Sequence, residues 1–507
     1  MKLSALPSAL SCAALALLYR GALAGNYYGQ EEGDYGNLGL ILGTVQSGFS
    51  YVETEHMPMY TWLSAVACLL VGDAHTGGLL VSLVMGAVTV GIVTWCASRW
   101  LSPEAGLVTG LLLVFQPDLA LTSATTLRTS TYTAFAAATL AAAGSRRWVL
   151  AGGLFGAAFL TRFDAILTLL PVLGLAAVLP WLRAEPAPTR RRAIGLGIPF
   201  LVTALWAGLY ARIHGHPRFW EGVVARNTAS YEDLGLIGRI AKGSETLWLV
   251  GREVLPDHLG WSVLALFPVG LALLARGRAR EAGPARSLGL MAVAATGLFA
   301  VTVLLSAYRW DHNLYWGWLA LALPFLLPIA AHGGVETVRG LGGRRAGAAV
   351  LGAGLGLATA LPMYRQTWHQ MTRSDQWIGS QVRLAEWADH AVPEGAPLLA
   401  DLVPATWIGR RPDSRPVLRW SQLGDRPAAD SREAFALWVR EEGVRVIVWF
   451  REDWVGAADR APFLSEAAAF DAGGLHFEPV AAEEGYGFVA WRVDGPGLPP
   501  LDPPQPE

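Results

Sequence analysis

The sequence predicts an all-α polytopic membrane bundle followed by a small C-terminal extracytoplasmic α/β domain. Of the 507 residues, 53% are hydrophobic and only 16% are charged, which is too little polar surface to solvate several globular domains. Apolar segments of about 20 residues, the length that a membrane-crossing helix needs, recur through residues 1–363. After Met363 the pattern changes to mixed polar and apolar segments with short strand-like runs.

We expect about eleven transmembrane helices, each crossing a hydrocarbon layer of ~30 Å. They are placed at residues 4–24, 77–99, 104–122, 126–143, 148–162, 164–182, 193–213, 258–276, 287–307, 313–332 and 346–363. The first span is expected to be retained, although Ala22–Ala24 has the small-residue pattern of a signal cleavage site. Residues 25–76 then form a first outer loop with interfacial helices.

The distribution of charge predicts the orientation of these spans. One set of short loops is basic and carries Arg99, Arg146–Arg147, Arg190–Arg192, Arg276 and Arg344–Arg345. The opposite set contains the acidic loop 25–76 and everything after residue 363. Because cytoplasmic loops are enriched in lysine and arginine, we expect a multi-pass protein of the cell inner (plasma) membrane. Its N-terminus would be cytoplasmic and its C-terminal domain periplasmic or extracellular.

Residues 364–494 have the pattern of the α/β domain. Helical stretches are expected at 374–392 and 431–443, and strand-like runs at 397–400, 444–450 and 487–493. Strands that alternate with helices are typical of a small α/β domain. Residues 495–507 are rich in proline and are predicted to form a disordered tail.

The first outer loop is acidic, aromatic and rich in glycine. Its ionisable side chains include Glu31, Glu32 and Asp34, followed later by Glu55 and His56. A loop of this length with its own charge cluster at a membrane surface is uncommon unless it binds or reacts with something. We therefore predict that it forms the acidic floor of a catalytic cavity that faces away from the cytoplasm.

Several segments occur in an order that is typical of one enzyme class. In the first outer loop, Glu31–Tyr35 has acidic residues followed by an aromatic, and Gly48–Tyr51 is a glycine–aromatic run. Glu55–Tyr60 is similar to the motif H/K-P-P-x-Y, with Met57 in place of the first proline. Further on, Leu160–Asp164 is similar to the motif LTRP, with Phe163 in place of the proline, and Tyr308–Tyr315 is followed by Leu321–Pro324. Together they resemble the C-type integral-membrane glycosyltransferases, which include protein O-mannosyltransferases and lipid A aminoarabinose transferases. The resemblance covers most of the chain as architecture, and the first loop and the LTR segment as motif.

The resemblance implies transfer of a sugar from a polyprenyl-phosphate donor to an acceptor lipid, glycan or protein on the outer face, with inversion. The acceptor hydroxyl must lose its proton, so a carboxylate general base is expected within hydrogen-bond reach. Asp34 is the first candidate for this base, with Glu32 and Glu31 as alternatives. A structural alternative is that Asp34 caps a helix beginning near Gly36, because aspartate is a preferred N-cap residue.

The leaving phosphate gains charge, so fixed cations or hydrogen-bond donors should face it. The expected substrate-binding residues are Glu55, His56, Tyr60, Arg128, Arg162, Arg309 and His312. Other roles remain open for some of them. Glu55 and His56 would also suit a polar pair at the membrane–water boundary. Asp164 lies two residues after Arg162, and Asp311 lies two residues after Arg309. Each arginine could therefore pair with its neighbouring aspartate instead of binding the donor phosphate.

No cofactor, resident metal or nucleic-acid partner is expected, and membrane lipids surround the bundle. A divalent cation held by the acidic loop is the alternative, although the histidine and carboxylates form no clear facial set.

Two other functions compete with catalysis: a lipid-linked glycan transporter or flippase, and a catalytically silent binding subunit. Transporters tend to place polar, broken helices at mid-membrane in two similar halves. Here the ionisable residues gather at the outer ends of the spans, which favours the transferase.

Overall fold

The computed structural model describes most of the helical region and the strands that follow it. The described ranges are 5–25, 31–49, 57–163, 165–178, 190–219, 255–276, 314–340, 397–400, 417–419, 431–450, 461–466, 468–483 and 488–498, with a few isolated residues between 244 and 407. The chain divides into two compact units. We call them the helical unit (Met1–Tyr27, Phe49–Ser64 and Leu79–Gln370) and the sheet unit (Tyr28–Gly48, Ala65–Gly78 and Met371–Glu507).

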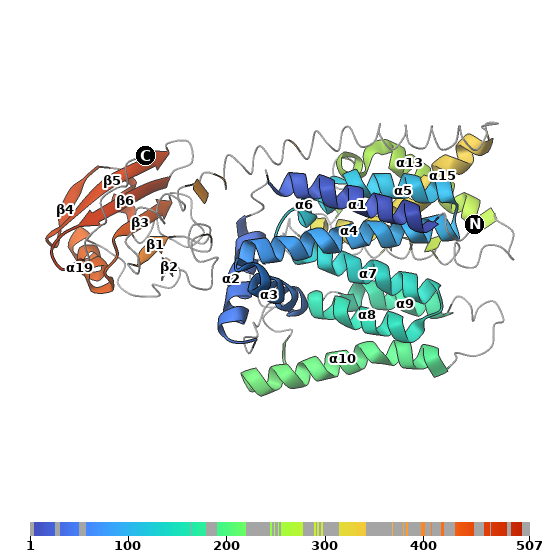
Figure 1. Cartoon of the computed structure of the whole chain (residues 1–507), viewed down its shortest axis with the longest axis horizontal. Coiled ribbons are helices and arrows are strands. Elements are labelled where there is room, and N and C mark those ends of the chain that lie inside the picture. Colours follow the sequence, from blue (N-terminus) through green and yellow to red (C-terminus); the bar gives the residue numbers. More distant parts are fainter. Residues whose placement is uncertain are drawn as a thin grey trace. The chain divides into compact units, whose positions relative to one another are not determined.

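The helical unit is a bundle of apolar helices that lie side by side (Figure 1). Its described helices are α1 (Ala5–Ala24), most of α4 (Ala74–Trp100), α5 (Pro103–Phe115), α6 (Pro117–Ser123), α7 (Arg128–Gly144), α8 (Trp148–Thr161), α9 (Ala165–Val178), α10 (Arg190–His214), α13 (Leu255–Arg276) and α15 (Leu314–Gly340). The most extensive helix pairs are α13 with α15, α8 with both α7 and α10, and α1 with α5. Since α7 and α8 are joined by only a short turn, they run antiparallel, and the start of α7 lies beside the end of α8.

Two of these pairs touch backbone to backbone at glycines. A Cβ atom at Gly152 of α8 would lie 2.2 Å from the carbonyl oxygen of Gly195 in α10. A Cβ atom at Gly270 of α13 would lie 2.1 Å from the carbonyl oxygen of Ile329 in α15. Small residues let membrane helices approach this closely, where lipid provides no hydrophobic driving force for association.

The observed helices follow the expected spans closely. α1, α4 and α10 are each long and apolar enough to cross a membrane, and α5 with α6 adds a fourth span if the bent pair counts as one. These four match the expected spans 4–24, 77–99, 193–213 and 104–122. Helices α7, α8 and α9 coincide with shorter expected segments. Because 346–363 and most of 287–307 lie outside the described residues, the count of about eleven stays a prediction.

The span formed by α5 and α6 bends by 58° at Gln116. Gln116 adopts an extended conformation, φ −65° and ψ 121°, which breaks the helix. Its side-chain oxygen accepts the backbone N–H of Leu119 at 2.7 Å and so caps the start of α6. Pro117 occupies the first turn of α6, where the N–H that proline lacks would have no helical acceptor. The sequence thus specifies the end of one helix and the start of the next.

The first outer loop contains two helices, α2 (Glu31–Gln46) and α3 (Met59–Val71). α3 begins just after Pro58, inside the loop 25–76 in which interfacial helices were expected. The expectation that a helix begins near Gly36 is wrong, because α2 already begins at Glu31. Acidic residues are favourable in the first turn, where the helix dipole is positive, so this glutamate pair belongs to the helix and not to the loop before it.

The sheet unit contains a mixed six-stranded sheet. The strands are β1 (Leu398–Ala400), β2 (Val417–Arg419), β3 (Val446–Phe450), β4 (Phe470–Ala472), β5 (Leu475–Glu483) and β6 (Phe488–Asp494), in the spatial order β2-β1-β3-β6-β5-β4. β1 is parallel to β2 and β3, and the pairs β3–β6, β6–β5 and β5–β4 are antiparallel. β1, β3 and β6 lie in the three expected strand-like runs, at 397–400, 444–450 and 487–493.

One described helix, α19 (Arg432–Glu442), packs on this sheet. Ser431 caps its start by accepting the N–H of Ala434, and Gly443 ends it at φ 70°, a conformation that favours glycine. The buried face of α19 and the sheet share a core that includes Phe435, Phe477 and Trp491. α19 lies in the expected helical stretch 431–443, whereas most of the expected stretch 374–392 and all of the tail beyond residue 498 lie outside the described residues.

The glycine contact between α8 and α10 predicts a paired stability test. Gly152→Ala should lower the free energy of unfolding by about 1–3 kcal/mol, because the added methyl group meets a backbone carbonyl that cannot move aside. Gly153→Ala is the matched control, since a Cβ atom there meets nothing within 4 Å. The control should be neutral or stabilising by about 0.5–1 kcal/mol. Thermal unfolding of the two variants in detergent checks this, and equal melting temperatures would contradict the packing.

Candidate active site

The three carboxylates proposed as the base lie in the first turn of α2. Glu31 and Glu32 are its first two residues, and Asp34 is the fourth. The alternative that Asp34 is an N-cap is therefore wrong, because an N-cap residue precedes the helix and Asp34 lies within it. The directions of these three side chains lie outside the described part of the structure.

Four of the expected binding residues, Glu55, His56, Arg309 and His312, lie outside the described residues. The same holds for Asp164 and Asp311, the ion-pair partners that the sequence offers to Arg162 and Arg309. Tyr60, Arg128 and Arg162 are described, and all three belong to the helical unit. The geometry of the candidate site therefore depends on these three residues and their neighbours.

Tyr60 is buried in the first turn of α3 and is linked by hydrogen bonds to the start of α7. Its hydroxyl lies 3.4 Å from the hydroxyl of Ser82 in α4, which donates to the carbonyl oxygen of Leu127 at 3.2 Å. A serine hydroxyl carries one proton, so Tyr60 is the donor to Ser82. Leu127 directly precedes Arg128, the first residue of α7. Three helices are thus tied together beside this arginine.

Arg128 and Arg162 lie at the same end of the bundle. Arg162 ends α8, and its guanidinium carbon lies 5.8 Å from the ring centre of Tyr132, a cation–π contact. Tyr132 is four residues after Arg128, and residues with this spacing share one face of a helix. The guanidinium of Arg162 therefore lies along the face of α7 that begins with Arg128. Both side chains are half-buried, and the N-terminus of α7 adds the positive end of a helix dipole.

A row of aromatic rings lines this end of the helical unit, and the sequence reasoning did not identify it. We call it the aromatic row: its members are Trp62, Trp206, Tyr210, Phe219, Phe159 and Phe163. Neighbouring rings along it are 5.8–6.4 Å apart, mostly edge to face. Phe163, which stands where the LTRP-like motif has proline, packs against Phe159 and Phe219. The i, i+4 spacing of Trp206 and Tyr210 was a usable signal. However, Trp62 of α3, which contacts Trp206, and Phe159 of α8, which contacts Phe219, are far away in sequence.

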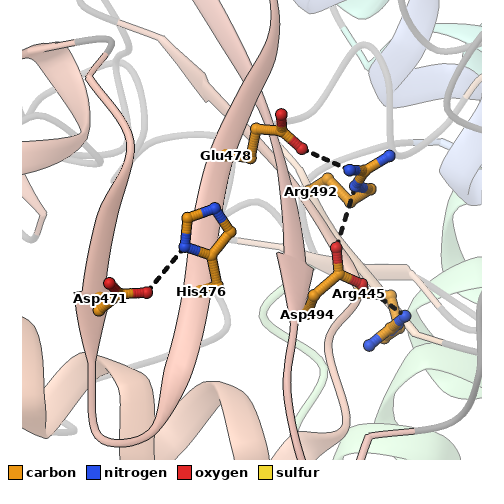
Figure 2. Close-up of polar contacts among 6 residues, drawn as sticks. All are labelled: Arg445, Asp471, His476, Glu478, Arg492 and Asp494. Atoms are coloured by element: carbon orange, nitrogen blue, oxygen red, sulfur yellow. Dashed lines mark hydrogen bonds and ion pairs between the residues drawn. The ribbon is translucent and has the colours of Figure 1, made fainter.

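A second polar cluster lies on the sheet unit, on strands β4, β5 and β6 and next to β3 (Figure 2). His476 pairs with Asp471 at 2.7 Å, and Arg492 pairs with Glu478 and, at 3.1 Å, with Asp494. Asp494 also accepts a hydrogen bond of 2.9 Å from Arg445, whose side chain is only 5% exposed. Burial lowers the pKa of Arg445, while the neighbouring Asp494 carboxylate opposes that shift. We call this cluster of ion pairs the ion-pair ladder and infer that it stabilises the sheet.

Metal binding has no support among the described residues, where no group of three or more His, Cys, Asp or Glu could hold an ion. The side chains of Glu31, Glu32, Asp34 and Glu55 in the first outer loop lie outside that description. The divalent-cation alternative for the loop therefore stays untested. The three cysteines, Cys12, Cys68 and Cys96, are buried and free.

The comparisons with known proteins agree with this architecture. ArnT from Cupriavidus metallidurans bound to undecaprenyl phosphate superposes with a TM-score of 0.65 and 16% sequence identity, over 96% of this chain and 98% of that one. The chain has the fold of the C-type membrane glycosyltransferases. The apo state of ArnT from C. metallidurans matches with a TM-score of 0.63, 16% identity and the same coverage.

Two further comparisons concern the C-type fold. The Archaeoglobus fulgidus oligosaccharyltransferase, in complex with zinc and sulfate, matches with a TM-score of 0.50 and 13% identity over 86% of this chain and 67% of that one. The family model for dolichyl-phosphate-mannose-protein mannosyltransferase matches residues 55–206. This range includes Tyr60, Arg128 and Arg162 and begins after the carboxylates of α2. No curated protein matches the chain by sequence.

The ion-pair ladder predicts unequal effects of removing its carboxylates. Asp494→Asn should destabilise the sheet by about 2 kcal/mol, because it leaves the buried Arg445 guanidinium without its counter-charge. Glu478→Gln removes only a half-exposed pair and should cost below about 1 kcal/mol. Hydrogen exchange of β3 and β6 in the full-length protein measures both effects. Equal protection in the two variants would show that Arg445 does not depend on Asp494.

Proposed function

We propose that this chain is a glycosyltransferase that moves a sugar from a polyprenyl-phosphate donor to a hydroxyl-bearing acceptor on the outer face of the membrane. The C-type fold and the match to the mannosyltransferase family model support this proposal. A C-type protein of the same fold, ArnT from C. metallidurans, has been crystallised with undecaprenyl phosphate, which supports the lipid class of the donor. The acceptor would be a lipid, a glycan or a protein.

The observation that carries the proposal is the placement of Arg128 and Arg162 along one face of α7. In the proposed step the bond between the anomeric carbon and the phosphate oxygen breaks, and a bond from the acceptor oxygen to that carbon forms with inversion. The electron pair of the broken bond goes to the phosphate, which leaves with an added negative charge. Arginine suits this charge because its planar fork donates two hydrogen bonds to phosphate oxygens.

The acceptor hydroxyl must give up its proton as it attacks, and a carboxylate would receive it. We propose Asp34 for this role, with Glu32 and Glu31 as alternatives. A single displacement needs one base and no carboxylate nucleophile, unlike a retaining glycosidase. Tyr60, held by Ser82, would serve as a fixed element of the donor site, with Glu55, His56, Arg309 and His312 completing it.

The proposed topology follows the basic loops. The N-terminus would be cytoplasmic, the chain would cross the inner (plasma) membrane several times, and residues 364–494 would form a periplasmic or extracellular domain. Arg128 and Arg162 would then lie at the outer end of the bundle, where a lipid-linked sugar is accessible after translocation. Residues 1–363 would contain the catalytic centre.

The base assignment predicts selective loss of turnover. Asp34→Asn should lower kcat by about 10²–10⁴-fold, the usual contribution of a general base, while donor binding is retained. Glu32→Gln and Glu31→Gln, made singly, should have smaller effects. The measurement is transfer from a polyprenyl-phosphate sugar by purified protein in detergent. Full activity in all three variants would contradict a base in the first turn of α2.

The phosphate assignment predicts loss of donor affinity. Arg128→Gln and Arg162→Gln should each weaken binding of polyprenyl phosphate by roughly tenfold or more, since a charge-assisted hydrogen bond is worth about 1.5–3 kcal/mol. Arg146→Gln, in the short turn between α7 and α8 at the other end of the bundle, is a control that should leave binding unchanged. Lipid binding with no sugar transfer in the wild-type protein would favour a flippase or a silent binding subunit over the transferase.

A further inference from the structure

Arg20 is a fully buried arginine within the apolar helix α1. Its relative exposure is 1%, and α1 is one of the helices that can cross a membrane. A charged side chain inside a membrane is costly and is therefore a functional hypothesis by default. Within the described part of the chain, Arg20 forms no ion pair. Its hydrogen-bond partners explain why it is there.

The guanidinium of Arg20 donates to both halves of the bent span. Its Nη2 donates to the carbonyl oxygen of Leu113 in α5 at 2.8 Å, and its Nη1 donates to the hydroxyl of Ser123 at the end of α6 at 2.9 Å. In a continuous helix the Leu113 carbonyl would accept the N–H of the residue four positions on. That residue is Pro117, which has no N–H. Arg20 supplies the donor that proline cannot.

The contacts of Ser123 extend from Arg20 to the start of α7. The hydroxyl of Ser130, the third residue of α7, lies 3.1 Å from the Ser123 hydroxyl and donates to the Thr122 carbonyl at 2.9 Å. Ser130 is two residues after Arg128. The first turn of α7 is therefore held on one side by the end of α6, where Arg20 donates to Ser123 and Ser130 donates to the neighbouring Thr122 carbonyl. On the other side it is held by Ser82 through Leu127.

Helix α4 closes the remaining side of this cluster. A Cβ atom at Gly86 would lie 2.2 Å from the Ser123 hydroxyl oxygen and 2.6 Å from Nη1 of Arg20. The backbone of α4 thus lies directly against the guanidinium. Because Arg20 is also only 1% exposed, a substrate group cannot reach its guanidinium, and its role is to hold protein segments in place.

We propose that Arg20 is a positioning residue that holds the bent α5–α6 span and, through Ser123 and Ser130, presents Arg128 to the donor phosphate. This inference rests on the proposed function for its catalytic consequence, but its structural part is independent. Arginine is required because its fork donates in two directions at once, whereas lysine offers a single point of charge. Small displacements of a binding group are enough to cost large factors in rate.

The test is a double-mutant cycle between Arg20→Met and Arg128→Gln. Alone, Arg20→Met should lower kcat/KM for the lipid donor by about tenfold or more. In the Arg128→Gln background the same change should have less than about a twofold effect, because residues that act through one another are not additive. Arg20→Lys should recover part of the loss. If Arg20→Met fails to fold, Arg20→Lys takes its place in the cycle.

A readout that does not depend on activity is hydrogen exchange of residues 117–133 in the full-length protein. Arg20→Met or Arg20→Lys should raise exchange there. The control Arg192→Met removes another buried arginine, whose guanidinium lies over the ring of Trp148, and should leave 117–133 protected. Additive losses in the cycle, or unchanged exchange in 117–133, would overturn the inference. Wild-type turnover in Arg128→Gln would instead refute the phosphate role, with the exchange result still deciding whether Arg20 holds the bend.

Discussion

Every backbone carbonyl inside a membrane must find a hydrogen-bond donor, and the break between α5 and α6 leaves the Leu113 carbonyl without its helical partner. Arg20 meets this need at the Leu113 carbonyl and at the same time joins the two halves of the span. The break is what brings α6 round to the start of α7. The buried Arg20 therefore stabilises the bent arrangement of helices at the end of the bundle where Arg128 and Arg162 lie.

Polar side chains from several helices lie at the same end of the helical unit. Tyr60 donates to Ser82, which donates to the Leu127 carbonyl. Arg162 lies over the ring of Tyr132, and the aromatic row packs against the end of α8. Charged groups are least costly at helix ends, where they reach the interface and the helix dipoles. The phosphate of a lipid-linked sugar also lies at the membrane–water interface. This coincidence makes the end of the bundle suitable for chemistry on a lipid-linked sugar.

The sequence predicted the helices well because a membrane span leaves a strong and continuous apolar signal. It placed Arg128 and Arg162 at helix ends for the same reason, and it expected interfacial helices in the loop where α2 and α3 lie. It misplaced the start of α2, since glutamates in a first helical turn look like loop residues in a single sequence. It also missed the row through Trp206 and Phe219, which depends on packing between distant segments, and it passed over Arg20 despite its isolation in an apolar run.

The most direct test of the account is a cryo-EM structure of the full-length protein with a polyprenyl-phosphate donor bound. The account predicts that the phosphate density contacts the guanidinium groups of Arg128 and Arg162 at the start of α7, with α5 and α6 still bent at Gln116. Phosphate density elsewhere, with both arginines turned away from it, would contradict the account.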